Sequence, residues 1–106
     1  MSIDGVPNPL AAAAPTPTAV RRTVTICNQK GLHARAAARF VKTAALFEAE
    51  VTVRKNGTSV SGRSIMGLMM LAAASGTIIE LAATGRDAAA AVDALARLIE
   101  CKFDED

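Results

Sequence analysis

Hydrophobic and polar residues recur with two different periods after the first 20 residues, and these periods predict a mixed α/β domain. Strict alternation, as in the segment TVTIC at 23–27, is typical of a strand with one buried face. Apolar residues at helical spacing mark amphipathic helices. The predicted strands span 23–27, 50–54, 58–62 and 77–83, and the predicted helices span 34–46, 65–74 and a segment beginning near Asp87.

The order of these elements predicts the fold class. Between the second and third strands, Asn56-Gly57 is the dipeptide typical of a tight hairpin turn. The other strands are separated by helices. This order favours an α+β fold, an open-faced sandwich in which a four-stranded antiparallel sheet is covered on one face by three helices.

The three helices differ in their faces. The first is apolar on one side and basic on the other, where Arg35, Arg39 and Lys42 lie. The second is predicted to be capped by the Ser64 hydroxyl and to end at Ser75-Gly76. The last carries an apolar stripe formed by Ala91, Val92, Leu95, Leu98 and Ile99.

The second helix has almost no polar face. One layer of three helices cannot bury it on every side, so part of it should be exposed for a partner. The alternative, simple core packing, fits Leu68 and Leu71 best, with Met70 as a further core candidate.

Residues 1–20 are rich in Ala and Pro and show no period, which predicts a flexible tail before a folded domain at 21–106. The tail contains no Lys or Arg, so it does not fit a signal or transit peptide. No segment approaches the roughly 20 apolar residues of a membrane span. We therefore expect a cytoplasmic protein with no membrane association.

Composition narrows the choice of partners. The chain has 106 residues, a net charge of +2 and an aromatic content of 3%, which argues against base stacking on nucleic acid. Residues 21–63 carry nine basic and two acidic side chains (+7), and residues 64–106 carry three basic and seven acidic ones (−4). The basic half fits the steering of acidic partner proteins better than nucleic-acid binding.

Cys27 and Cys101 are expected to be small buried residues on a strand and a helix, with a redox pair as the alternative. Two Cys and one His cannot form a four-ligand structural zinc site without carboxylates.

The only histidine, His33, lies in Gly31-Leu32-His33-Ala34-Arg35 at the start of the first helix. Free N–H groups and the helix dipole make such a position an anion site. A neutral imidazole there is a nucleophile, and Arg35 supplies a cation for a bound phosphoryl group. These residues predict a phosphohistidine site. The alternative is an exposed or capping histidine beside an arginine on a solvated helix.

These residues resemble the HPr family, the histidine-containing phosphocarriers of bacterial phosphotransferase systems. The resemblance covers 21–106 and is most specific at 31–35, at Arg63-Ser64-Ile65-Met66-Gly67 with the following 68–71, and at Gly76-Thr77. It implies the same open-faced fold. It departs from the family at Ala36, where relatives have Pro; Ala restores an N–H donor there.

The resemblance implies a carrier without cofactor or metal, not an enzyme with independent turnover. His33 would accept a phosphoryl group on Nδ1 from phosphorylated enzyme I, which obtains it from phosphoenolpyruvate, and pass it to a histidine of enzyme IIA. Arg35 would stabilise the phosphate. Ser64 matches the serine that HPr kinase/phosphorylase phosphorylates. The implied docking surface consists of Ala34, Arg35, Lys42, Ile65, Met66 and Met69 on a monomer.

Two segments of the sequence point to different branches of the phosphotransferase system. The ending at 103–106 (FDED) is similar to nitrogen-branch carriers, whereas 64–67 (SIMG) is similar to kinase-regulated HPr proteins. A regulatory phosphorelay, with or without sugar uptake, is favoured over sugar uptake alone. The alternatives to a carrier are a non-catalytic regulatory binding module of the same fold and a small α+β ligand- or metal-binding domain.

Overall fold

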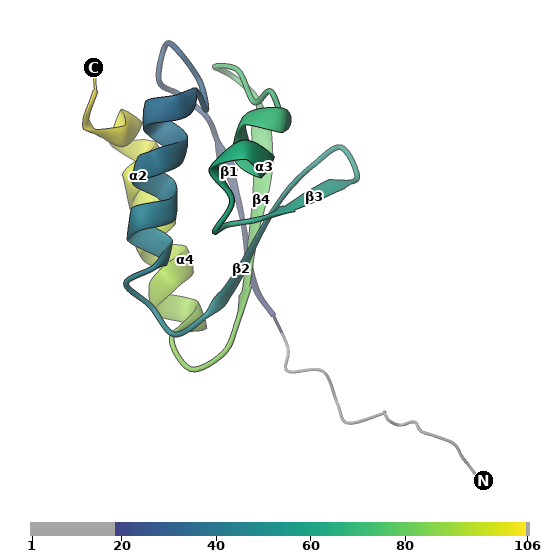
Figure 1. Cartoon of the computed structure of the whole chain (residues 1–106), viewed down its shortest axis with the longest axis vertical. Helices are drawn as coiled ribbons and strands as arrows, with labels where there is room; N and C mark the ends of the chain where they lie inside the picture. The colour runs from purple at the N-terminus through teal and green to yellow at the C-terminus, as the bar shows by residue number, and fades with distance from the viewer. Residues whose placement is uncertain (1–18, 106) are drawn as a thin grey trace, which may run out of the picture.

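Four strands pair into one antiparallel sheet in the order β1-β4-β2-β3. The computed structural model describes residues 19–105, and within them the strands are β1 (Val20–Thr25), β2 (Glu50–Lys55), β3 (Thr58–Ser61) and β4 (Ile78–Thr84) (Figure 1). The register sets Val24 opposite Ile79 and Val53 opposite Leu81, and all four side chains are buried. One face of the sheet is therefore apolar throughout, as the alternation predicted.

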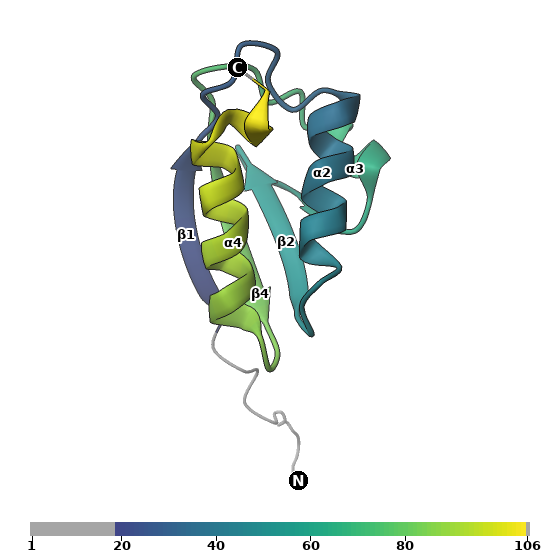
Figure 2. The same ribbon diagram turned by 90° about the vertical axis from the view of Figure 1, so that its left-hand side faces the viewer.

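Three helices cover that apolar face. They are α2 (Ala34–Ala44), α3 (Ile65–Met70) and α4 (Ala88–Glu100), and a short turn, η1 (Lys102–Asp104), follows α4. Figure 2 shows α2 and α4 side by side in front of the sheet, with η1 near the N-terminal end of α2. The predicted fold class is confirmed: one antiparallel sheet with helices on a single face.

Small residues allow the helices to lie close to the sheet and to each other. Ala36 and Ala37 of α2 and Ala91 and Ala96 of α4 are fully buried. Phe40 is one of the largest fully buried side chains of the same core. The predicted stripe on α4 is confirmed except at Leu98, which is only partly buried.

Most differences from the predicted elements are shifts of a few residues at their ends. β1 begins at Val20 and ends at Thr25, and α2 ends at Ala44. Ile26 lies just beyond β1 but keeps two backbone bonds to the chain before β4: its N–H donates to the Thr77 carbonyl at 2.8 Å, and its carbonyl accepts from the Gly76 N–H at 2.7 Å.

The prediction that the second helix extends to Ala74 is wrong, because α3 ends at Met70. Ala72 adopts the left-handed conformation (φ +52°), which stops the helix. The Lys55 ammonium donates to the carbonyls of Leu71 (2.9 Å) and Ala72 (3.1 Å). A cation from the β2–β3 hairpin thus satisfies carbonyls that a longer helix would have used itself.

The expectation for the cysteines is also wrong. Cys27 and Cys101 are both exposed and carry free thiols, because Cys27 lies after the end of β1 and Cys101 at the C-terminal end of α4. The Cys27 thiol donates to the Ile99 carbonyl at 3.2 Å.

The predicted flexible tail lies outside the described residues except at its last two positions, and it stays a prediction. Within residues 19–105, no helix is long and apolar enough to cross a membrane.

Gly31→Ala should destabilise the fold more than Gly57→Ala does. Both glycines have positive φ (+67° and +85°), so alanine costs about 1 kcal/mol at either position. A Cβ at Gly31 would also lie 2.5 Å from the Ala73 carbonyl oxygen, whereas nothing lies within 4 Å at Gly57. We expect an extra loss of about 1–2 kcal/mol for Gly31→Ala in urea unfolding. Equal losses for the two variants would contradict this close approach.

Ala72→Gly should stabilise the protein. A left-handed L-residue costs about 1–2 kcal/mol, and the entropy of glycine in the unfolded chain cancels part of the relief, leaving a gain of about 0.5 kcal/mol. Ala90→Gly is the matched control, since Ala90 is exposed inside α4 and glycine there should cost about 1 kcal/mol. Thermal unfolding of the two variants should therefore shift in opposite directions; a shift in the same direction would refute the strain at Ala72.

Candidate functional site

His33 occupies the N-cap position of α2, as predicted. Its backbone is extended (φ −76°, ψ −178°), and its side chain makes no capping bond. The first helical hydrogen bond runs from the Ala37 N–H to the His33 carbonyl at 2.8 Å. The N–H groups of Ala34, Arg35 and Ala36 therefore have no acceptor within the helix and form its positive end.

The loop before His33 is held by contact between two backbones. The Leu32 N–H donates to the Ala73 carbonyl at 2.9 Å, and the Leu32 side chain is buried. Gly31 lies directly on the backbone of Ala73 and Ala74, where a side chain would not fit. The segment after α3 therefore supports the loop that carries His33.

A carboxylate from the other end of the chain contacts the imidazole. Glu105 Oε2 lies 2.8 Å from His33 Nε2, and the two side chains are 12% and 27% exposed. Within residues 19–105, His33 Nδ1 has no hydrogen-bond partner. Nε2 is thus occupied by the carboxylate, and Nδ1 is available to bind another group.

Asn28 connects this carboxylate to the loop. Its side chain is fully buried, and its Nδ2 donates to the Gly31 carbonyl at 2.8 Å and to Glu105 Oε1 at 3.3 Å. Both partners are acceptors, so the amide nitrogen must face them. Asn28 Oδ1 is buried without a partner among the described residues.

The chain end reaches His33 through an unusual turn. Lys102, Phe103 and Asp104 all have positive φ (57°, 55° and 59°). Each left-handed residue costs about 1–2 kcal/mol. Phe103 is completely buried, and its burial stabilises the turn by about 1.5–3 kcal/mol. This anchor fixes the position of the Glu105 carboxylate, two residues later.

Sequence reasoning did not identify Asn28 or Glu105 as site residues. The ending FDED indicates only a similarity to nitrogen-branch carriers. The available signal was Phe103, a large apolar residue among acidic ones, because such a residue near a chain end is a candidate anchor. Nothing in the sequence indicated which side chain the following carboxylate would meet.

Arg35 lies one helix position after Ala34 and is exposed. It forms no ion pair with any residue of the described range 19–105. Arg39, by contrast, lies 3.6 Å from Asp104 Oδ2 in η1. Of the two arginines on α2, Arg35 is therefore nearer to His33 in sequence and has no carboxylate partner among residues 19–105.

The α3 patch, formed by Ile65, Met66, Met69 and Met70, is exposed to between 40% and 79%. Leu68 and Leu71 are buried, as predicted, but the assignment of Met70 to the core is wrong, because 79% of this residue is exposed. The predicted docking residues Ala34, Arg35 and Lys42 of α2 are also exposed. Helices α2 and α3 pack together, so the polar and apolar parts adjoin.

Ser64 is confirmed as the N-cap of α3. Its Oγ accepts a hydrogen bond from the Gly67 N–H at 2.9 Å. The side chain is partly buried at the start of the α3 patch.

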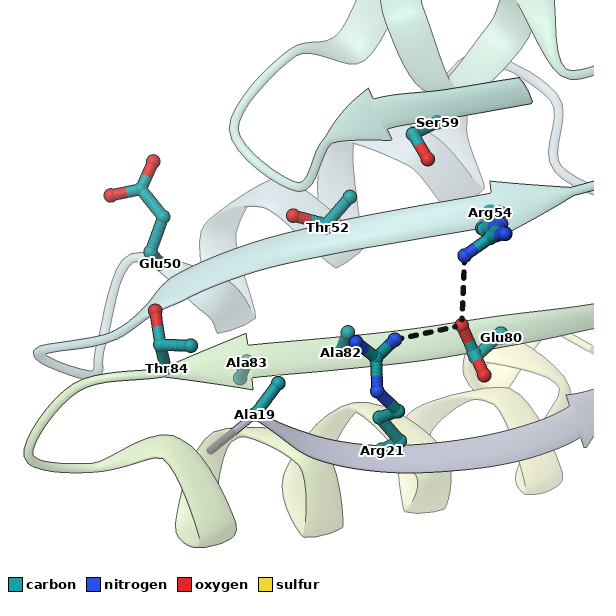
Figure 3. A pocket seen from close by; sticks show the side chains of 10 residues that line it. All are labelled: Ala19, Arg21, Glu50, Thr52, Arg54, Ser59, Glu80, Ala82, Ala83 and Thr84. Atoms are coloured by element: carbon teal, nitrogen blue, oxygen red, sulfur yellow. Dashed lines mark hydrogen bonds and ion pairs between the residues drawn. The ribbon is translucent and has the colours of Figure 1, made fainter. Parts of the chain in front are cut away.

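A shallow pocket lies on the opposite, uncovered face of the sheet (Figure 3). There Glu80 lies between two arginines, at 3.3 Å from Arg21 and 3.8 Å from Arg54. Glu80 and the two arginines are paired with one another, and the pocket does not include His33. Within residues 19–105, no cluster of three or more His, Cys, Asp or Glu side chains could hold a metal ion.

Comparison with known proteins places this geometry in a family. Residues 20–101 match the family model described as "PTS HPr component phosphorylation site". The chain is 52% identical over 86 residues to the phosphocarrier protein HPr of Neisseria meningitidis, covering 81% of this chain and 97% of that one. It is 46% identical over 88 residues to the phosphocarrier protein NPr of Shewanella violacea, covering 83% and 97%.

Solved HPr structures have the same fold as this chain. HPr from Thermoanaerobacter tengcongensis superposes with a TM-score of 0.79 at 44% identity, covering 82% of this chain and 98% of that one. HPr from Bacillus anthracis gives 0.74 at 40% identity, covering 76% and 96%. The chain belongs to the HPr family of the phosphotransferase system and is a phosphocarrier, not an enzyme with its own turnover.

Proposed function

We propose that His33 accepts a phosphoryl group on Nδ1 from the phosphohistidine of enzyme I, charged from phosphoenolpyruvate, and passes it to a histidine of enzyme IIA proteins. Membership of the HPr family implies partners among enzyme I and the enzyme II components. The observation that carries the proposal is the difference between the two ring nitrogens of His33. Nε2 contacts the Glu105 carboxylate, whereas Nδ1 has no partner among residues 19–105 and lies at the start of α2.

The helix end supplies the electrostatics of the transfer. The N–H groups of Ala34, Arg35 and Ala36 are donors for the phosphoryl oxygens, and the Arg35 guanidinium adds a positive charge. Ala36 contributes an N–H that proline would lack. Each transfer exchanges one phosphohistidine for another, so it is close to isoenergetic and needs no cofactor or metal.

The docking surface of this carrier comprises Ala34, Arg35, Lys42, Ile65, Met66 and Met69. These residues combine exposed cations on α2 with adaptable apolar side chains on α3. Such a surface fits several acidic partners that have an apolar centre, bound one after another.

The first test is phosphorylation with enzyme I and labelled phosphoenolpyruvate. The wild-type chain should take up one acid-labile phosphate, and His33→Ala should take up none, because no other histidine is present. Arg39→Ala is the control, since Arg39 lies on the same helix but pairs with Asp104. It should retain uptake within about twofold, because an exposed ion pair contributes little. Absence of label on the wild-type protein, with enzyme I still bound, would instead indicate a non-catalytic binding module of the same fold.

We also propose that Ser64 is a regulatory phosphorylation site for an HPr kinase/phosphorylase. A phosphate at this cap keeps acceptor oxygens near the Gly67 N–H, so α3 stays capped. It adds a charge of about −1.5 to −2 beside the α3 patch, which repels an acidic partner.

Incubation with ATP and the kinase should place an acid-stable phosphate on the wild-type protein and on Ser61→Ala, but not on Ser64→Ala. Ser61 is a matched control because it is exposed three residues earlier, in β3. The phosphorylated protein should accept phosphate from enzyme I at least about tenfold more slowly, as expected from like-charge repulsion at docking. Label that persists in Ser64→Ala would assign the site elsewhere.

We propose that the carrier works in the cytoplasm in a regulatory, nitrogen-type phosphorelay, with or without sugar uptake. Relatives named HPr and NPr both match at similar identity, which is compatible with either branch. Identification of the extract proteins that receive label from the phosphorylated chain distinguishes the branches.

A further inference from the structure

Glu105 is the one acidic side chain that touches the imidazole among residues 19–105, and the proposed transfer does not yet use it. It is largely buried, in contrast to the neighbouring Asp104, whose side chain is 66% exposed. Its two oxygens are divided between two partners: Oε1 faces Asn28 and Oε2 faces His33. A carboxylate held at both oxygens has a defined orientation.

The hydrogen-bond directions follow from the chemistry of these groups. A carboxylate only accepts, and the Asn28 amide donates to Oε1. The remaining oxygen, at 2.8 Å from the imidazole, therefore requires a donor, so the proton of the neutral ring lies on Nε2. The lone pair of that ring is then on Nδ1.

We propose that Glu105 is a positioning residue for phosphoryl transfer, which fixes the Nε2–H tautomer and the ring orientation of His33 so that Nδ1 is presented as the nucleophile. The proposal rests on the proposed function, since it concerns the same histidine. It assigns to the chain end a role in the reaction rather than in folding alone.

The carboxylate assists both directions of the transfer. On charging, the Nδ1 lone pair forms a bond to phosphorus, the donor P–N bond breaks, and its electron pair returns to the donor imidazole. The Nε2 proton stays on His33, so the phosphorylated ring is an imidazolium whose positive charge faces Glu105. On discharge the P–N bond electrons return to this protonated ring, which becomes neutral imidazole and is therefore a good leaving group.

The fold holds Glu105 at this position from two sides. Phe103, two residues earlier, is fully buried, and the buried Asn28 amide fixes Oε1. Asn28 also binds the Gly31 carbonyl of the loop before His33. Nucleophile and carboxylate are thus positioned by a shared side chain, which limits their relative motion.

The test compares Glu105→Ala, Glu105→Gln and the control Asp104→Asn, each checked for an unchanged far-ultraviolet spectrum and melting temperature. The first measurement is the ¹⁵N–¹H correlation spectrum of the imidazole at pH about 8.5, above the ordinary titration range of histidine. Wild type and Asp104→Asn should show the Nε2–H tautomer, because both keep the Glu105 carboxylate. Glu105→Gln should not hold a single tautomer, because its one amide oxygen cannot accept from both Asn28 and His33. Glu105→Ala should show exchange between both tautomers. A single Nε2–H tautomer in Glu105→Ala would overturn the proposal.

The second measurement is the kinetics of phosphate uptake from phosphorylated enzyme I. Glu105→Ala should lower kcat by about tenfold with KM within about twofold, a loss typical of removing the partner that orients a functional histidine. Glu105→Gln should also lower kcat, since its single amide oxygen cannot accept from Asn28 and His33 together, and Asp104→Asn should match wild type. Unchanged kcat in Glu105→Ala, or equal losses in Asp104→Asn, would overturn the positioning role.

The two measurements separate this proposal from the proposed function. If the wild-type protein takes up no phosphate, the carrier function fails, whatever the spectra show. If the wild-type protein is phosphorylated on His33 and Glu105→Ala is phosphorylated equally fast, only the role of Glu105 fails.

Discussion

The close approach of Gly31 to the backbone of Ala73 and Ala74 is the contact on which the site depends. It joins the loop before α2 to the segment after α3, and the bond from Leu32 to the Ala73 carbonyl secures it. The start of α2 is therefore held beside α3, which brings the histidine and the α3 patch to one side of the molecule. A side chain at position 31 would separate the two segments and, with them, the nucleophile from the apolar surface.

Irregular backbone is concentrated around His33, and buried groups offset its cost. Ala72 and the three residues of η1 are left-handed although none is glycine. Lys55 satisfies the carbonyls exposed where α3 stops, and Phe103 is buried where the chain end turns. Strain of this kind persists only where the surroundings over-determine the conformation. Here the two strained segments support the loop and place the carboxylate.

Periodicity was sufficient to predict most of the fold because the sheet has only one covered face. Apolar residues alternate with polar ones at Val51 and Val53 and at Ile79 and Leu81. When one face of a sheet is buried and the other is open, this alternation predicts which side chains face the core. The failures occur where a distant group overrides a local pattern. The apolar run after Ser64 predicts a helix through Ala74, but the lysine of a separate hairpin takes the carbonyls at its end. Met70, the last residue of α3, belongs to that same run and is exposed.

The sequence alone determined the position of His33 at a helix start, the Ser64 cap and the family, because each depends on residues adjacent in the chain. The Asn-Gly turn between β2 and β3 likewise depends on two neighbouring residues and was predicted from the sequence. Only the tertiary structure decided the contact between His33 and Glu105, 72 residues apart, and its link through Asn28. A buried amide and a carboxylate carry no local periodicity, so their meeting follows from how α4 directs the chain end back to α2.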